Sequence, residues 1–223
     1  MKKLFAALLG LSVLGAPAIA EPEVKPYSLD AQGCMKLREC TRDVHRIRDF
    51  SQFNYFIADS FSLSNKQEIT ELIKEIDRAG VEIYIADAKY FTNTTRGLYY
   101  TDVNRLFLNN AYVYMPNTFL SVLRHEGWHA AQDCMAGTLD NTFIAIIHQD
   151  GVIPNSYQIL ADARYGLLMP GAVPWEAEAM FAADVEEMTL DAVAACARGK
   201  MWETYTPTPM TKTWLIKNGY IKD

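Results

Sequence analysis

The chain has 223 residues, half of them hydrophobic, and a formal net charge of −6. This length and composition suit one globular domain with a substantial core, or at most one domain with a small appended subdomain. Low-complexity tracts and internal repeats are absent from the sequence. The acidic balance argues against nucleic acid or anionic lipid as a partner, because both are themselves negatively charged.

The first twenty residues have the pattern of a signal peptide. Two lysines precede an apolar run that ends in Ala18-Ile19-Ala20, the small-x-small pattern that signal peptidase cuts. The alternative is an uncleaved membrane anchor, but the run is short for a span and contains two glycines and a proline. We expect an exported protein, periplasmic or secreted, of residues 21–223. Without the two lysines, its 19 basic and 27 acidic residues give a net charge of −8, and no stable membrane association is expected.

The first half of this chain mixes helical and strand patterns. Residues 21–63 show a patchy helical period and predict one or two short helices. Residues 64–80 carry isoleucines and a leucine at helical spacing, with a glycine as the stop, and predict a clear helix. Residues 81–91 alternate apolar and other side chains and predict a half-buried strand. Residues 97–114 predict two or three short antiparallel strands, because β-branched and aromatic residues are interrupted by turn formers.

The second half is helical by pattern. Residues 115–137 predict a helix that Asn117 or Thr118 caps and that Gly137 ends. Three later stretches also predict helices: 141–149, 155–166 with Asn155 as its cap, and 174–199. The order indicates an α+β fold, in which a small, mostly antiparallel sheet packs on a helical part of the chain.

The four cysteines predict two disulfides, because disulfides persist in exported proteins. We favour Cys34 with Cys40 as a local clip and Cys134 with Cys196 as a bridge between distant elements. Since Cys196 falls at the end of the predicted helix 174–199, the second bridge would join that helix to the helix 115–137. Use of these cysteines as zinc ligands is disfavoured, because no pair has the CxxC spacing.

The sequence HEGWH, residues 125–129, predicts a zinc site. On a helix, residues four apart lie on the same face, so His125 and His129 can turn their imidazoles to one point. Glu126 is then placed beside a metal-activated water as a general base, which is the HExxH arrangement of zinc peptidases. The alternative is a buried histidine pair without metal. His45 and His148 have no partner at ligand spacing and are expected to be surface or hydrogen-bonded residues.

A third protein ligand is needed, and the sequence offers two glutamates for it. No histidine follows the motif closely, and Asp133 lies about 12 Å beyond His125 along the helix axis. The stretch VPWEAEAMFAAD supplies Glu176 and Glu178 on a second helix. These two side chains point about 200° apart, so both cannot reach one metal. The residue that loses this competition is expected to be a solvated charge.

These two helices together resemble the gluzincin branch of zinc metallopeptidases, in which a glutamate from a second helix joins the HExxH pair. The resemblance covers about one sixth of the chain and implies a zincin-like fold for residues 21–223. It also implies Glu176 as the third ligand, with Glu178 the runner-up. Many gluzincins carry an acid four residues after that glutamate, where it orients a ligand histidine, but Met180 occupies this position here. Asp184 and Asp150 are the candidates to replace it.

The expected function is hydrolysis of peptide bonds in a peptide or protein substrate, with one Zn²⁺ per chain and Glu126 as base and proton shuttle. Tyr157 and Tyr165 lie between the motif and Glu176 and are candidate oxyanion donors, although the sequence does not choose between them. Residues 104–110 are the strand expected to pair with an extended substrate. The alternative is an exported metal-binding or structural protein with the same fold and little turnover. Hydrolysis of a non-peptide bond, as in a peptidoglycan amidase, is a third and weaker hypothesis.

Overall fold

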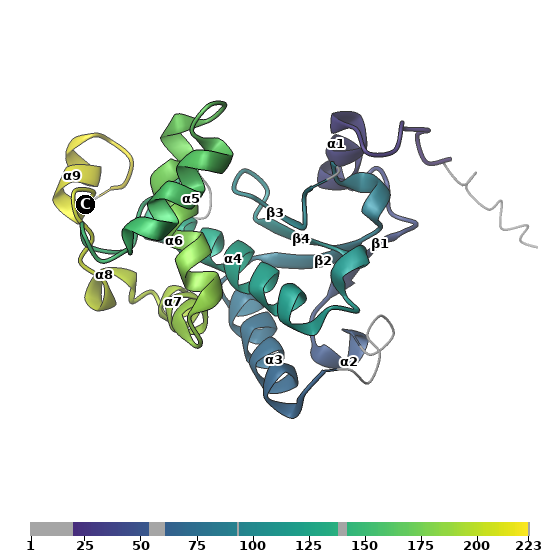
Figure 1. Ribbon diagram of the computed structural model, residues 1–223, viewed down its shortest axis with the longest axis horizontal. Coiled ribbons are helices and arrows are strands. Elements are labelled where there is room, and N and C mark those ends of the chain that lie inside the picture. Colours follow the sequence, from purple (N-terminus) through teal and green to yellow (C-terminus); the bar gives the residue numbers. More distant parts are fainter. Residues whose placement is uncertain (1–19, 54–60, 93, 138–141, 223) are drawn as a thin grey trace, which may run out of the picture.

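The computed structural model describes residues 20–53, 61–92, 94–137 and 142–222, so the predicted signal peptide lies outside the described residues except for Ala20. The described elements are α1 Leu29–Leu37, β1 Val44–Ile47, α2 Phe50–Phe53, α3 Leu63–Arg78, β2 Glu82–Ala86, η1 Ala88–Tyr90, β3 Gly97–Tyr100, β4 Arg105–Asn109, η2 Asn110–Tyr112, α4 Pro116–Met135, α5 Asn155–Tyr165, η3 Pro170–Ala172, α6 Val173–Asp184, α7 Met188–Ala197, α8 Met201–Thr204 and α9 Lys212–Lys217. Figure 1 shows the sheet at one end of the molecule, α5 to α9 at the other, and α4 between them.

Among the described helices, none is both long enough and apolar enough to cross a bilayer.

The strands of the described chain form one sheet in the order β1-β2-β4-β3. Both outer pairs are antiparallel, which was predicted for β3 with β4, but the central pair of β2 and β4 is parallel, so the sheet is mixed. The α+β prediction is confirmed. The prediction that residues 104–110 offer a free edge is wrong, because β4 is paired on both sides, and within the described chain β3 is the edge strand on that side. The short strand β1, of sequence VHRI, was not predicted.

Both faces of the sheet are covered. Helices α3 and α4 pack on one face in a large core that includes Ile83 and Leu106. On the other face, α1 packs over a second cluster that includes Tyr84 and Phe107, whose rings stack with centroids 5.0 Å apart. This second layer explains why β2 is more buried than its alternating pattern predicted. Helix α4 itself has the sheet on one flank and the later helices on the other (Figure 1).

Helix α3 confirms the clearest helical prediction. Its cap is Ser62, whose hydroxyl accepts from the Asn65 backbone N–H, and Gly80 follows its end with a φ of 93°. The buried face consists of the predicted isoleucines and leucine. Such a spacing brings apolar side chains onto one stripe of the helix, and here the stripe faces α4 and the sheet.

The predicted helix over residues 141–149 is absent from the described part, residues 142–149. This segment is irregular because its backbone donors bond elsewhere. The Ala145 N–H donates to the Gln132 carbonyl at 3.0 Å, and the N–H groups of Ile147 and His148 donate to the carboxylate of Glu178. Partners from α4 and α6 therefore replace the helical hydrogen bonds that the apolar pattern suggested.

The predicted helix over residues 174–199 is two helices, α6 and α7. The break follows Asp184, and Glu187 has a φ of 64°, in the left-handed region. The Ala183 carbonyl, which a continuous helix would bond to residue 187, accepts from Arg124 Nη1 at 3.3 Å. A buried arginine on α4 thus satisfies the end of a helix that no glycine or proline marks.

Both predicted disulfides are present. Cys34 and Cys40 are joined with a Cα–Cα distance of 5.2 Å, and Cys134 and Cys196 with one of 5.9 Å. The second bridge differs from the prediction in what it connects. Because the long helix is broken, Cys196 lies on α7, so the bridge ties α4 to α7 and not to the helix that carries Glu176.

Candidate metal centre

The HEGWH sequence lies in the middle of the long helix α4. Pro116 occupies the first turn, where its missing N–H costs no hydrogen bond, and Gly137 follows the end with a φ of 101°. The predicted cap is wrong, since the N-cap is Met115 and no side chain bonds there. Trp128 is fully buried.

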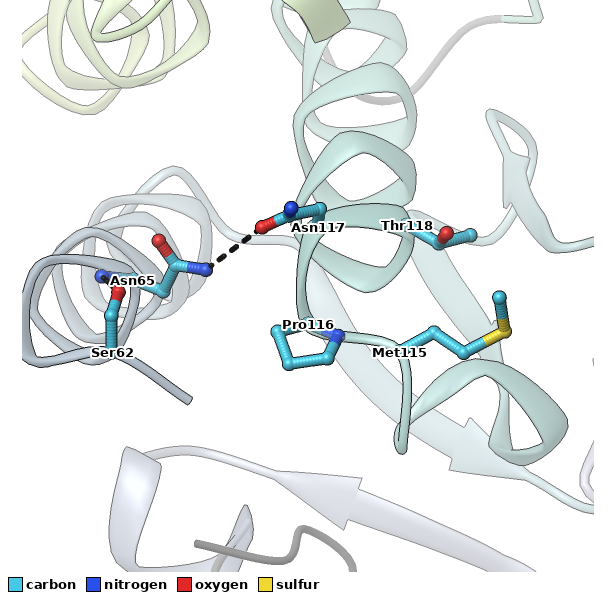
Figure 2. Close-up of a pocket in the computed structure, with 6 residues that line it drawn as sticks. All are labelled: Ser62, Asn65, Met115, Pro116, Asn117 and Thr118. Atoms are coloured by element: carbon cyan, nitrogen blue, oxygen red, sulfur yellow. Dashed lines mark hydrogen bonds between the residues drawn. The ribbon is translucent and has the colours of Figure 1, made fainter. Parts of the chain in front are cut away.

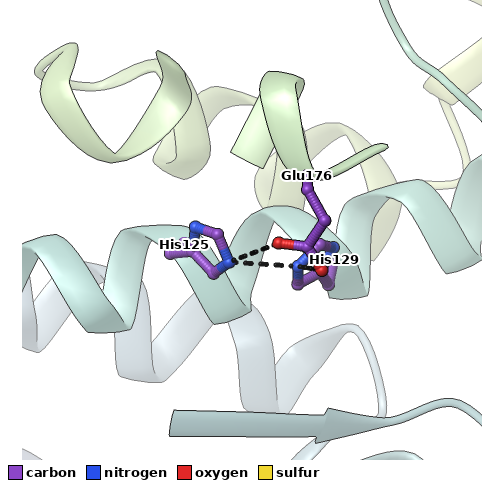
Figure 3. A group of neighbouring side chains, drawn as sticks. All are labelled: His125, His129 and Glu176. Carbon is purple, nitrogen blue, oxygen red and sulfur yellow. Dashed lines mark hydrogen bonds and ion pairs between the residues drawn. The ribbon is translucent and has the colours of Figure 1, made fainter. Parts of the chain in front are cut away.

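Three predicted residues converge on one point between α4 and α6. Figure 3 shows His125 and His129 side by side on α4, with Glu176 reaching down from α6. The two Nε2 atoms are 3.2 Å apart. Glu176 Oε2 is 3.4 Å from His125 Nε2, and Glu176 Oε1 is 3.7 Å from His129 Nε2. These residues could together hold a metal ion.

The spacing and chemistry of the three donors fit a small divalent cation. Ligand atoms about 2.0–2.1 Å from a tetrahedral metal lie about 3.3 Å from each other. The distance between the two Nε2 atoms is close to this value, and one ligand atom from each of the three residues lies within 4.8 Å of the others. Glu176 Oε2 is buried and has no well-aligned hydrogen bond from a described residue, although His125 Nε2 lies 3.4 Å away. A buried carboxylate oxygen without a well-aligned donor is costly, and a cation would satisfy it. The residues therefore fit a metal ion.

Gln132 fixes the state of His129. The amide nitrogen of Gln132 donates to Glu178 Oε2 at 2.8 Å and to the Trp175 carbonyl at 3.1 Å. Its oxygen therefore faces His129 Nδ1, 2.8 Å away, and this nitrogen must carry the proton. Burial lowers the pKa of His129 to about 4, so the ring is neutral and its Nε2 lone pair faces the centre. A metal ligand needs this tautomer.

The pKa of His125 is shifted in the opposite direction to that of His129. Burial alone would lower the pKa of His125, but Glu176, Glu126 and a hydrogen bond to the Ala179 backbone outweigh it and raise the pKa above its ordinary value. Since His129 Nε2 is an acceptor, His125 Nε2 is the donor across the 3.2 Å contact. That proton and a metal ion compete for one point, so metal binding at this site releases a proton.

Glu126 lies on the flank of α4 that faces the sheet. Burial raises the pKa of Glu126 to about 7, the negative charge of Glu176 acts in the same direction, and a hydrogen bond from the Tyr99 backbone N–H opposes both. A Cβ added at Gly97 would lie 2.7 Å from Glu126 Cγ and 2.8 Å from Val122 Cγ1. The edge strand β3 can approach Glu126 this closely only because residue 97 has no side chain.

Glu178 is not among the converging donors. It is 2 % exposed, and its carboxylate accepts from Gln132, from Trp128 Nε1 at 3.4 Å and from the two backbone N–H groups of residues 147 and 148. The expectation that the unused glutamate would be a solvated charge is therefore wrong. Glu176 contacts the two histidines of α4, whereas Glu178 contacts Gln132 and Trp128 of the same helix, so only Glu176 reaches the converging donors.

Of the other candidate site residues named from the sequence, Tyr165 contacts the converging donors, whereas Tyr157, Met180 and Asp150 have other partners. Burial alone would raise the pKa of Glu176, but the hydrogen bond with His125, the charges of both histidines and a hydrogen bond from Tyr165 outweigh it and lower the pKa. Tyr157 instead donates to Asp184 at 2.9 Å. Met180 packs in a small apolar cluster, and Asp150 follows the irregular segment 142–149, where its backbone N–H donates to a threonine hydroxyl.

Gln132, Tyr99 and Gly97 were not predicted as site residues. Only Gln132 had a usable signal, since it lies three residues after His129 on the same helix face and is a polar residue in a buried run. The remaining histidines lie outside the centre. His45 pairs with Ile85 in the sheet, and the ring of His148 stacks on Trp128 with centroids 5.3 Å apart.

A cavity of about 480 Å³ lies at the N-terminal ends of α3 and α4, apart from the converging donors (Figure 2). Its lining consists of small polar residues, a proline and a methionine: Ser62, Asn65, Met115, Pro116, Asn117 and Thr118. Asn65 and Asn117 bond across it at 3.4 Å. This lining contains no charged side chain, so the cavity lacks the acid–base chemistry found at the metal centre.

The chain matches no protein-family model, no curated protein and no solved structure. Its function therefore has to be argued from the site.

Proposed function

We propose that the protein is an exported zinc-dependent peptidase of the gluzincin type, with a zincin-like fold. The observation that carries the proposal is the convergence of His125, His129 and Glu176, with Glu126 next in sequence to the first histidine. The α+β order, with an edge strand beside the motif helix, supports it. The two disulfides are compatible with an exported protein.

Zinc is the proposed metal because two imidazoles and one carboxylate form a donor set typical of catalytic zinc sites. When bound, Zn²⁺ acts as a Lewis acid that lowers the pKa of water towards neutrality and polarises a carbonyl group. His125, His129 and Glu176 would hold the ion, and zinc held by three protein ligands could also bind a water or the substrate. His129, neutral and held by Gln132, needs no proton loss before it binds.

Glu126 is proposed to take and return protons. Its raised pKa, about 7, lets the carboxylate accept a proton from water and later donate it to a leaving amine. The Tyr99 N–H holds the carboxylate from the sheet side. Tyr165 is the proposed oxyanion donor, because its hydroxyl already lies at the Glu176 carboxylate, whereas Tyr157 is engaged by Asp184.

An extended peptide is the proposed substrate, and β3 is the strand beside which it would lie. β3 replaces residues 104–110 in this role, because β4 has a neighbour on each side. Adding a strand to a sheet edge supplies main-chain hydrogen bonds that do not depend on the substrate's sequence. The Tyr99 N–H is already bonded to Glu126, so Gly97 offers the next backbone groups of this edge.

A metal-binding protein with little turnover is the second candidate. The observation that favours it is the engagement of Glu126 by a backbone N–H and by close packing on Gly97, which restrains a proton shuttle. The two functions differ in the effect of Glu126→Gln. A peptidase loses hydrolysis and keeps its metal, whereas a binding protein has no hydrolysis to lose.

Elemental mass spectrometry of the purified protein tests the metal site. We expect about one zinc per wild-type chain, and loss of zinc in His129→Ala and Glu176→Ala. Hydrolysis of a mixed peptide library, followed by mass spectrometry, then compares wild type with Glu126→Gln, and we expect a loss of at least about 100-fold. Zinc-free wild type after metal-replete refolding would overturn the zinc peptidase, and equal hydrolysis by both proteins would overturn the role of Glu126.

A further inference from the structure

We infer that Glu178 and Gln132 form a hydrogen-bonded relay that orients His129 for the metal. Glu178 is then a positioning residue that acts through Gln132 and does not itself bind the metal. The inference rests on the proposed metal site and deepens it. It assigns a role to a buried carboxylate that the three donor residues leave unused.

The geometry of the relay fixes its direction. Gln132 is fully buried and lies one helical turn after His129. Its amide nitrogen is bound by two acceptors, Glu178 Oε2 and the Trp175 carbonyl, so the amide cannot turn over without losing both hydrogen bonds. The amide oxygen is thereby held against His129 Nδ1 at 2.8 Å. The imidazole can donate to it only as the Nδ1–H tautomer, which leaves Nε2 free for a metal.

Glu178 is itself held from three parts of the chain. It lies on α6, accepts from Trp128 and Gln132 of α4, and accepts from the backbone N–H groups of Ile147 and His148. Trp175, next to Glu176, supplies the second acceptor for Gln132. The relay therefore couples the orientation of His129 to the helix that presents the third donor, and a shift of α6 would affect both.

This arrangement replaces the acid whose expected position is occupied by Met180. An acid in direct contact would hold the histidine with one charge-assisted hydrogen bond. Here the charge stands one residue further away, and the glutamine transmits it by polarising its amide. A metal-ligating histidine commonly uses its second nitrogen in such a bond, and loss of the partner lowers metal affinity about 10- to 100-fold.

Zinc affinity measured by competition with a chromophoric chelator tests the relay. We expect Gln132→Met, which keeps an unbranched side chain without the amide, to weaken zinc binding about 10- to 100-fold. Glu178→Gln should weaken it similarly, because an amide cannot accept from every donor that the carboxylate accepts from. Gln67→Met is the matched control: it makes the same exchange at an exposed glutamine of α3, whose amide donates to Glu71 and contacts none of the relay residues, so we expect less than about a threefold change.

Two spectroscopic measurements separate positioning from fold stability. The Co²⁺-substituted Gln132→Met protein should show altered d–d bands, because the His129 ring is free to turn. In wild type without added metal, ¹H–¹⁵N correlation of the His129 ring should show the Nδ1–H tautomer, and this measurement needs no variant to fold. An Nε2–H tautomer would overturn the relay.

The outcomes distinguish the inference from the proposed function. Zinc bound by wild type and within about threefold as tightly by Gln132→Met would overturn the relay and leave the metal site standing. Absence of zinc from wild type would overturn the proposed function and, with it, the relay. Weak binding by Gln132→Met and Glu178→Gln, with near-normal binding by Gln67→Met, would support both.

Discussion

The two flanks of α4 place their functional side chains by different means. On the sheet flank, Glu126 lies against β3, where a missing side chain at Gly97 and a backbone N–H at Tyr99 determine its position. On the α6 flank, His129 is held by the amide of Gln132, which is in turn held by Glu178. The position of Glu126 should therefore change when any atom is added at residue 97. The orientation of His129 should change when the amide of Gln132 is replaced by an apolar group, even one of similar size.

On the sheet flank, Tyr99 of β3 also forms hydrogen bonds to α4. The Tyr99 hydroxyl donates to Asp133 Oδ2 at 2.6 Å, and its backbone N–H bonds to Glu126, so one strand residue contacts two turns of α4. Asp133 is fully buried. Because it bonds to the strand, it is not directed at the metal centre, in agreement with the distance argument made from the sequence.

The largest loss of stability is expected from removal of a disulfide. The two disulfides lie in different parts of the molecule, so their removal also compares those parts. Cys134–Cys196 closes a span of 62 residues and ties α4 to α7, whereas Cys34–Cys40 closes a span of 6 beside α1. From the entropy of the unfolded chain, replacing the first pair by alanines should lower the free energy of unfolding by about 4 kcal/mol, and the second by about 2 kcal/mol. Denaturant unfolding measures both.

The same pair of variants tests which flank the long bridge supports. Zinc content should fall in the Cys134→Ala/Cys196→Ala protein near its unfolding transition, because α4 carries both histidines. It should stay normal in the Cys34→Ala/Cys40→Ala protein, whose bridge lies on the far face of the sheet. Equal losses of stability in the two variants would contradict the chain-entropy argument.

A smaller effect is expected at the closest contact of the sheet flank. Gly97→Ala places a Cβ within 2.8 Å of Glu126 Oε1 and Val122 Cγ1, so β3 has to move away from α4. Overpacking of this kind costs about 1–3 kcal/mol, measured by denaturant unfolding. Hydrolysis should fall because Glu126 loses its position, while zinc content should be unchanged because the three donors lie on the other flank.

Gly33→Ala is the matched control for this substitution. Gly33 lies inside α1, and a Cβ there would meet no described atom within 4 Å. Alanine in a helix interior is favoured over glycine, so we expect a gain in unfolding free energy of about 0.5–1 kcal/mol and no change in zinc content. If Gly97→Ala behaved like Gly33→Ala, the close approach of β3 would not determine the position of Glu126.

The sequence predicted the features that depend on local pattern. The apolar period of α3, the glycine stops and the two histidines on one face of α4 all follow from helix geometry. It failed where a distant partner decides the backbone. Residues 142–149 are irregular because Glu178 and Gln132 bind their N–H groups, and α6 ends where Arg124 binds the Ala183 carbonyl. All three partners lie on α4 or α6, and local patterns cannot show that these helices meet the segments concerned.

The site shows the same division. The convergence of His125 and His129 could be predicted from their spacing on α4. That only one of Glu176 and Glu178 would join them could be predicted from their separation by two residues on a helix. The role of Glu178 could not be predicted, because it depends on backbone donors from the segment 142–149. The position of Glu126 depends on β3, whose approach needs Gly97 and the parallel pairing of β2 with β4.

The smallest predicted effect concerns the sheet alone. Glu82 accepts from Arg46 at 2.5 Å, from Arg105 at 3.0 Å and from the Tyr84 hydroxyl at 2.9 Å. Burial alone would raise the pKa of Glu82, but the hydrogen bonds from Arg105 and Tyr84 and the charge of Arg46 outweigh it and lower the pKa below 4.5. The stabilisation is therefore complete above pH 4.5 and is lost as the pH falls through the lower, folded-state pKa.

Thermal unfolding of wild type and Glu82→Gln between pH 3 and 7 tests this sign. At neutral pH the variant should be less stable by less than about 1 kcal/mol, because partly exposed ion pairs contribute little. The difference should shrink below pH 4.5, where the wild-type carboxylate gains its proton and resembles the amide. A difference independent of pH would mean that packing, and not charge, holds β1, β2 and β4 at this position. Zinc content at pH 7 should be equal in both proteins, since Glu82 contacts neither flank of α4, and this would separate the stability of the sheet from the assembly of the metal centre.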